Sequence, residues 1–179
     1  VRSGEADGAF NSSYRPERAL YGVYPTKDGE LDPARATLNY TYWLYTGSGS
    51  RVSWDGVSFG GLVRPVGAER SAAIVPELKK RGAEVIEAET YEEMLRMLAE
   101  GEVDAVAGFE GNVDIFLRTA PQHYRDVVRH PVPLVRKTGY LMFSKHFYAR
   151  ERERAERIWD AIAQVWSSPV ATEIRRNYE

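Results

Sequence analysis

Residues 90–109 read TYEEMLRMLAEGEVDAVAGF, and this stretch decides the expected fold. Thr90 is placed to cap the first turn of a helix, with Glu93 three residues later as in a capping box. The apolar residues that follow form one stripe of that helix and comprise Met94, Leu95, Met97 and Leu98. Gly101 ends the helix, and residues 103–109 are small and β-branched, as in a buried strand. Helix, glycine and strand together make half of a βαβ crossover, which indicates a parallel sheet.

The flanking segments continue this alternation of strands and helices. Apolar runs and amphipathic stretches predict a strand framed by residues 62–67, a helix over 71–81 and a strand at 85–86. Residues 62–110 are therefore expected to form a β-α-β-α-β unit of an α/β protein. Aromatic and β-branched residues predict a long strand over 34–46, and apolar spacing predicts a helix over 149–166. A short final helix is expected over 169–178.

The Gly-Glu-x-Asp motif at residues 101–104 has a weaker counterpart at residues 4–7. Both copies continue into a small residue and an apolar run, but no helix precedes the first copy. A strand at residues 6–10 needs a neighbour to cover its apolar side. We therefore expect the natural protein to continue N-terminal to Val1, unless the motif recurs by chance. The exposed sheet edge of such an incomplete unit would favour a dimer.

Composition excludes several classes of function. The 179 residues are 43% hydrophobic and 28% charged with a formal net charge of -2, so a globular protein is expected and nucleic acid is not an expected partner. The sequence has no cysteine, which excludes disulfides and zinc–thiolate sites. Its 3 histidines are scattered in polar contexts, so no metal site is expected. No apolar run reaches the roughly 18 residues of a membrane span.

Four further segments occur in a particular order along the chain. They are SYRPERALY at residues 13–21, a Val-Gly turn with Arg70-Ser71 before a helix, the Gly-Glu-x-Asp-Ala motif with an acidic residue after it, and YLMFSK at residues 140–145 before a helix that contains Ile158-Trp159. This order resembles that of periplasmic solute-binding protein family 3, the substrate-binding proteins of amino-acid ABC transporters. The likeness covers nearly all of the chain. Family members carry further residues before the equivalent of Val1.

The resemblance implies a type II periplasmic-binding-protein-like fold, in which two α/β lobes are joined by a hinge of two extended crossovers. The ligand of such a protein is clamped between the lobes by a hinge motion. On this basis lobe 1 is expected to comprise residues 1–60 and 140–179, incomplete at its N-terminus, and lobe 2 residues 61–139.

The resemblance also implies a carboxylate site in lobe 1. Arg18 aligns with the family's arginine that binds a ligand carboxylate, and Asn11 and Ser13 align with its polar strand end. The chemistry is reasonable because a guanidinium fork matches a carboxylate with two parallel hydrogen bonds. The alternative is that Arg18 is a solvated residue at a helix start, paired with Glu17 or Asp28.

In lobe 2 the resemblance implies a second set of ligand contacts. Arg70 and Ser71 fall where family members place a helix N-terminus that donates backbone N–H groups to the ligand. The Gly-Thr pair usual in the family is missing here, and the alternative is that Arg70 is simply exposed.

Glu110 follows the strand at residues 103–109, and ligands of open α/β sheets bind at the carboxyl ends of strands. Family members often place an acidic residue there to hold the ligand ammonium, although Phe109 is the closer match in position. The alternative is a structural salt bridge from Glu110 to Arg64 or Lys137.

These features imply a periplasmic or other extracytoplasmic solute-binding protein rather than an enzyme. Its ligand would be a polar amino acid or small carboxylate, its partner would be the membrane permease of an ABC importer, and no cofactor is expected. Two alternatives remain open. One is the ligand-sensing domain of a signalling protein, and the other is a lyase similar to cyclohexadienyl dehydratase, in which Glu110 would act as the acid.

Overall fold

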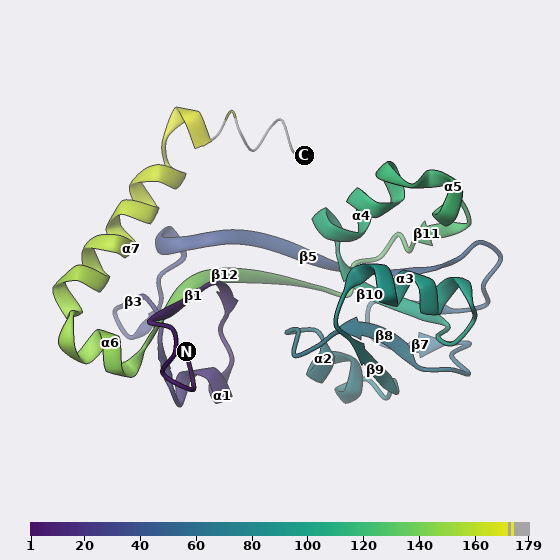
Figure 1. The fold of residues 1–179 in the computed structure, drawn as a ribbon, viewed down its shortest axis with the longest axis horizontal. Helices are drawn as coiled ribbons and strands as arrows, with labels where there is room; N and C mark the ends of the chain where they lie inside the picture. Colours follow the sequence, from purple (N-terminus) through teal and green to yellow (C-terminus); the bar gives the residue numbers. More distant parts are fainter. Residues whose placement is uncertain (172, 174–179) are drawn as a thin grey trace. The chain divides into compact units, whose positions relative to one another are not determined.

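The computed structural model describes residues 1–171 and 173, which form two compact units. Of the described residues, unit 1 comprises 1–39, 137–171 and 173, and unit 2 comprises 40–136. The chain passes from one unit to the other within β5 (Ala36–Gly47) and again within β12 (Val135–Ser144) (Figure 1). These divisions fall after Asn39 and Arg136, whereas the sequence led us to expect them after residues 60 and 139.

Unit 1 is built around the C-terminal part of β12, which pairs antiparallel with β1 (Gly8–Ser13) and with β2 (Gly22–Val23). Its smaller elements are α1 (Pro16–Ala19), β3 (Thr26–Lys27), β4 (Glu30–Leu31) and the 3-10 turn η1 (Pro33–Arg35). Two helices follow β12, namely α6 (Lys145–Arg150) and α7 (Arg152–Trp166). The strand expected at residues 6–10 therefore begins at Gly8 and runs on to Ser13.

The single helix predicted over residues 149–166 is two helices in the structure. The Ser144 hydroxyl accepts a hydrogen bond from the Phe147 N–H at 3.0 Å, which caps a helix that starts at Lys145. Glu151, with φ -127 and ψ 35, then separates α6 from α7. The aromatic core of this region comprises Phe143, Phe147, Ala155 and Trp159.

Unit 2 is a mixed sheet with the strand order β5-β10-β8-β9. The strands β8 (Val66–Glu69), β9 (Val85–Ala88) and β10 (Ala105–Phe109) are parallel, while β5 is antiparallel to β10 and also pairs with β11 (Val127–Arg129). The helices are α2 (Val75–Lys80), α3 (Tyr91–Ala99), α4 (Glu110–Thr119) and α5 (Pro121–Tyr124), and a small hairpin joins β6 (Ser53–Trp54) to β7 (Phe59–Gly60). The β-α-β-α-β unit predicted from the sequence is confirmed.

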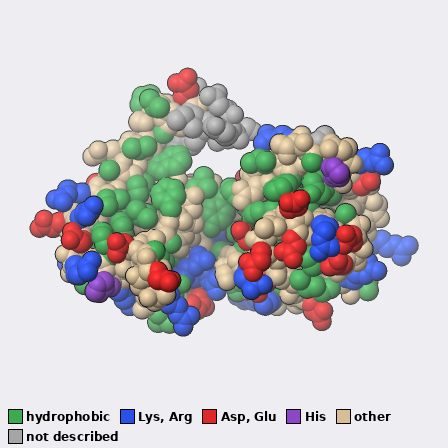
Figure 2. All heavy atoms as spheres, in the orientation of Figure 1, with side chains coloured by type: hydrophobic (Ala, Val, Ile, Leu, Met, Phe, Trp, Pro, Cys, Tyr) green, Lys and Arg blue, Asp and Glu red, His purple; other side chains and the backbone are tan. Residues whose placement is uncertain are grey.

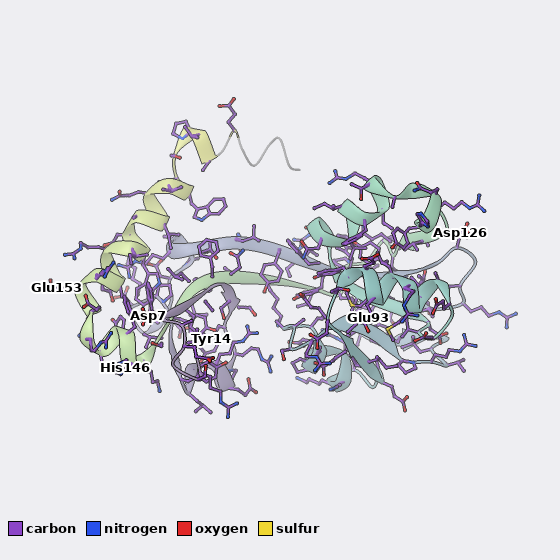
Figure 3. All side chains as sticks on the ribbon, viewed as in Figure 1. Asp7, Tyr14, Glu93, Asp126, His146 and Glu153 are labelled. Carbon is purple, nitrogen blue, oxygen red and sulfur yellow. The ribbon has the colours of Figure 1, made fainter. Side chains whose placement is uncertain are left out.

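The helix–glycine–strand stretch also forms as predicted. The Thr90 hydroxyl accepts a hydrogen bond from the Glu93 N–H at 3.1 Å, and Gly101 has a φ of 71°. The Glu93 carboxylate accepts a hydrogen bond from the Glu89 N–H at 2.9 Å (Figure 3 labels Glu93). In a capping box the donor is the N–H of the capping residue itself, which here is Thr90, one residue later. Helix α3 and the strand then supply most of the unit 2 core, which comprises Tyr45, Ala88, Tyr91, Met94, Leu95, Met97, Val103, Val106 and Val113.

Two predicted element boundaries in unit 2 are wrong for the same physical reason. The Asp104 carboxylate accepts hydrogen bonds from the Val63 and Arg64 N–H groups, both at 2.6 Å, so this segment is a loop and the strand begins only at Val66. Helix α2 begins at Val75 rather than at Ser71, whose φ is 59° and whose N–H donates to Glu87. Side-chain carboxylates thus replace the backbone partners that the sequence pattern suggested.

Two further findings concern the rest of the chain. The helix expected over residues 169–178 lies largely outside the described residues. Within residues 1–171 and 173, no helix has the length and apolar character needed to cross a bilayer. Figure 2 shows acidic and basic side chains interspersed on the face of unit 2 that it presents, in keeping with the near-neutral net charge of -2.

Candidate functional site

In unit 1 the structure brings Arg18 together with the end of β1. The Arg18 Nη1 donates to the Ser13 carbonyl oxygen at 3.0 Å and lies 3.3 Å from the Ser13 hydroxyl. It is also within 3.5 Å of the Ser12 hydroxyl. Helix α1, which starts with Pro16 after an extended Arg15, returns the chain so that Arg18 faces the strand that precedes it. A guanidinium and two hydroxyl groups therefore share one partly buried location.

Tyr24 completes this group, and the sequence did not indicate it. Its hydroxyl donates to the Ser13 carbonyl oxygen at 3.0 Å and lies 3.0 Å from the Ser12 hydroxyl. Burial raises the pKa of Tyr24, while hydrogen bonding to Ser12 opposes that rise, so the phenol is neutral at ordinary pH. The ring is packed edge-on between Tyr14 and Tyr140, at centroid distances of 5.4 and 6.2 Å. Tyr14 itself is 45% exposed and is labelled in Figure 3 beside β1.

Asn11 lies apart from these contacts, on the exposed side of a bulge in β1. The register of β1 against β12 shifts between Ala9 and Ser12, and Asn11 has a φ of 54°, which asparagine tolerates better than most residues. A Cβ atom added to Gly139 would lie 3.1 Å from the Asn11 Cα, so the bulge depends on a glycine opposite it. The structure thus brings Ser13 to Arg18 and leaves the Asn11 side chain exposed.

In unit 2 the groups at Arg70 and Ser71 face carboxylates of the same unit. The Arg70 Nε lies 2.9 Å from Glu89, and both side chains are mostly exposed. The Ser71 N–H donates to the Glu87 carboxylate at 2.9 Å, and this backbone hydrogen bond lowers the pKa of Glu87. Because α2 starts at Val75, no helix N-terminus lies at these two residues. A ligand anion there would have to compete with Glu87 and Glu89.

Glu110 begins α4 directly after β10 and belongs to a cluster of polar and aromatic side chains. Its carboxylate accepts a hydrogen bond from the Trp43 indole N–H at 2.8 Å, and Arg129 lies 3.9 Å away. The Arg129 guanidinium covers the Trp43 ring at 4.7 Å and pairs with Asp114 at 3.0 Å. The Tyr45 hydroxyl also donates to Asp114, and burial, followed by the Asp114 charge, raises the pKa of Tyr45. The Glu110 side chain is 39% exposed in this arrangement, so its carboxylate is accessible to another partner.

Within the described part of the chain, no three His, Cys, Asp or Glu side chains are grouped so that they could hold a metal ion. The three histidines are at positions 123, 130 and 146, and His146 lies exposed on α6 (Figure 3).

Comparison with known proteins shows similarity in structure. No protein-family model matches the chain, and no curated protein matches it in sequence. A Streptococcus pneumoniae amino acid ABC transporter substrate-binding protein, AbpA, bound to L-arginine, matches 93% of this chain at a TM-score of 0.68 and 17% identity. The arginine-, lysine-, histidine-binding protein ArtJ of Geobacillus stearothermophilus matches 99% at a TM-score of 0.72 and 16% identity. An arginine transport system periplasmic binding protein of Legionella pneumophila matches 100% at a TM-score of 0.73 and 14% identity.

The chain is shorter than these proteins. It spans 64% of the S. pneumoniae protein, 71% of ArtJ and 75% of the L. pneumophila protein. At such low sequence identity the likeness is one of fold. The chain accordingly has the α/β fold of type II periplasmic binding proteins, as its sequence led us to expect.

Proposed function

We propose that this protein is an extracytoplasmic solute-binding protein that binds a polar amino acid or small carboxylate without chemical change. It would deliver this ligand to the membrane permease of an ABC importer. The likeness in fold to substrate-binding proteins of amino-acid transporters supports the proposal. The single observation that carries it is the Arg18 guanidinium held against Ser13.

The Arg18 group has the properties of a carboxylate site. Its Nη1 is fixed by the Ser13 carbonyl oxygen, so the plane of the guanidinium is oriented before a ligand arrives. Guanidinium N–H groups bind carboxylates through charge-assisted hydrogen bonds, and neighbouring hydroxyl groups can donate to the same oxygens. The two serine hydroxyl groups beside Arg18 belong to side chains that are 8% and 2% exposed, so they hold fixed positions. We assign the ligand carboxylate to this group, with Asn11 as a further proposed contact.

The ligand ammonium group is assigned to Glu110. The Trp43 N–H holds one carboxylate oxygen in place, and the Arg129 guanidinium, which is 3.9 Å away, lies closer to Asp114. Glu110 also lies at the carboxyl end of a strand in an open α/β sheet, where ligands commonly bind. Arg70 and Ser71 remain proposed ligand contacts. To bind an anionic group of the ligand, Arg70 would have to release Glu89 and the Ser71 N–H would have to release Glu87.

A thermal-shift screen with the twenty amino acids and small carboxylates tests the proposal. A true ligand at about 100 times its Kd adds roughly 2.7 kcal/mol to the free energy of unfolding and raises Tm. Arg18→Ala should abolish the shift, because it removes the carboxylate partner. Arg15→Ala is the matched control, since Arg15 lies three residues away and pairs with the exposed Glu17 at 3.5 Å. A panel in which no compound raises Tm would contradict the proposed function.

A further inference from the structure

Aspartate is followed by glycine at three places in the sequence, residues 7–8, 28–29 and 55–56. At such a pair the glycine nitrogen can attack the aspartate Cγ, because glycine has no Cβ to hinder the approach. A bond forms between this nitrogen and Cγ, and the amide proton and the carboxyl hydroxyl leave as one water molecule. Water then opens the resulting succinimide ring at either carbonyl group, which gives back aspartate or yields isoaspartate. The three pairs share this chemistry, so their local structure decides which of them reacts.

The peptide bond between Asp7 and Gly8 is held by the sheet of unit 1 (Figure 3 labels Asp7). Its carbonyl oxygen accepts a hydrogen bond from the Ser144 N–H at 2.7 Å, and Gly8 lies opposite Phe143 of β12. A Cβ atom added to Gly8 would lie 2.9 Å from the Met142 carbonyl oxygen. This peptide group therefore cannot rotate toward the Asp7 carboxyl group unless β1 separates from β12.

The Asp55 carboxyl group is held by the turn that it begins. Its Oδ1 accepts hydrogen bonds from the Val57 and Ser58 N–H groups at 2.8 and 2.7 Å, and its Oδ2 accepts one from the Ser58 hydroxyl at 2.9 Å. The hydrogen bond from the Ser58 N–H, followed by that from Val57, lowers the pKa of Asp55. Ring closure needs the neutral carboxyl group, because an ionised carboxylate is a poor electrophile. Both the position and the charge of Asp55 therefore oppose the reaction.

Asp28 and Gly29 have neither of these restraints. They form the two-residue turn between β3 and β4, with φ values of 54° and 86°, as in a type I′ turn. Within the described residues, no hydrogen bond or ion pair holds the Asp28 carboxylate. Both residues are exposed, and apart from the chain neighbours no atom lies within 4 Å of the place that a Cβ of Gly29 would take. The carboxyl group and the glycine nitrogen are therefore free to approach each other.

The hairpin that carries this turn is small. Strands β3 and β4 are two residues long each and form a sheet of their own. A two-stranded hairpin has little stability of its own in water. Leu31, at the end away from the turn, packs against the buried cluster that contains Tyr24. Lys27 and Glu30, which flank the turn, are exposed. The turn can therefore change conformation while the far end of the hairpin stays packed.

We propose that Asp28 is a site of spontaneous modification, at which this protein converts aspartate to isoaspartate ahead of Asp7 and Asp55. Isoaspartate adds one carbon atom to the main chain of a two-residue turn, so Lys27 and Glu30 no longer pair in the same register. The inference depends on local structure alone and is independent of the proposed function.

Peptide mapping of the aged protein tests the inference. The folded protein is incubated in mildly acidic buffer, and isoaspartate is measured at each of the three sites by mass spectrometry with electron-transfer fragmentation, which distinguishes it from aspartate. Isoaspartate should form at residue 28 at least about tenfold faster than at residues 7 and 55. The same chain unfolded in urea should show rates within about threefold of one another at the three sites, since the structural restraints are then lost.

Two glycine variants provide a matched pair. Gly29→Ala places a methyl group beside the attacking nitrogen and should slow the reaction at residue 28 at least about fivefold. Gly56→Ala makes the same change in the turn at Asp55 and should leave the rate at residue 28 unchanged.

A folded protein that forms isoaspartate at residue 7 or 55 as fast as at residue 28, or at none of the three sites, would overturn the inference. So would a rate at residue 28 that Gly29→Ala does not lower.

Discussion

The Thr37 hydroxyl is buried without a hydrogen-bond partner among the described residues, and its side chain is 1% exposed. An unpaired buried hydroxyl costs on the order of 1 kcal/mol or more relative to an apolar group of the same shape. Thr37→Val should therefore raise the free energy of unfolding by about 1 kcal/mol, measured by chemical denaturation. Thr37→Ser keeps the hydroxyl and removes a methyl group, so it should destabilise. A Val variant less stable than the parent would show that the hydroxyl has a partner in solution.

Buried tyrosines give the protein a predictable response to alkaline pH. Burial is the main cause of a raised pKa at Tyr24, Tyr45, Tyr91, Tyr140 and Tyr148. A raised pKa in the folded state means that this stability is present below pH 10, the unfolded value, and is lost as the pH rises toward the folded value. For Tyr91 the folded pKa is about 12, so up to about 3 kcal/mol is lost above pH 10. Denaturant titrations at pH 9 and 11 should show the loss, and Tyr91→Phe should reduce it; equal free energies of unfolding at the two pH values would contradict this.

At the scale of the element, Arg35 links η1 to α7. Its guanidinium lies 2.7 Å from Glu156, 2.8 Å from Asp160 and 3.6 Å from Asp32, and the side chain is 18% exposed. Arg35→Ala should cost about 2 kcal/mol, because it also removes the packing of the arginine stem and leaves three carboxylates close together. Arg96→Ala is the control, since Arg96 is 49% exposed in its own acidic cluster and should cost less than about 1 kcal/mol. Urea denaturation measures both, and equal costs would refute the linking role.

Local sequence signals predicted the elements that depend on local contacts. The capping box at Thr90 and the glycine stop at Gly101 both formed, because each involves neighbours in the chain. The start of α2 was missed because the deciding group, the Glu87 carboxylate, lies outside the predicted helix. The break between α6 and α7 was missed because it falls at Glu151, where no glycine or proline marks it in the sequence. The proposed site residues show the same difference between contacts within one segment, which the sequence predicts, and contacts between distant segments, which it does not.

Arg18 and Ser13 are five residues apart and lie together, as their spacing within one short segment allowed. Tyr24 could not be predicted because it reaches the serines across 11 and 12 residues of chain. The pairing of Tyr91 with Glu69 spans 22 residues and depends on α3 packing against β8. The sequence pattern can predict each of these elements but not which side chains meet across them.

At the scale of the whole molecule, unit 2 is one continuous segment, residues 40–136, whereas unit 1 is made from two segments. Unit 2 has its own parallel strands, covering helices and hydrophobic core. A segment with its own core can fold alone. We expect residues 40–136, expressed by themselves, to give a dispersed amide NMR spectrum and a cooperative thermal transition. A collapsed spectrum would show that unit 2 depends on unit 1 for its stability.

The proposed function requires a contact between Arg18 and a ligand carboxylate. The decisive measurement is a calorimetric comparison of the tightest-binding amino acid with its α-carboxamide, in the unaltered protein and in Arg18→Ala. The amide removes the negative charge, so it should bind at least about 100-fold more weakly to the unaltered protein. Any weak binding that Arg18→Ala retains at high ligand concentration should differ by less than about fivefold between the acid and the amide. An amide that binds the unaltered protein as tightly as the acid, or an equal loss in both proteins, would contradict the account.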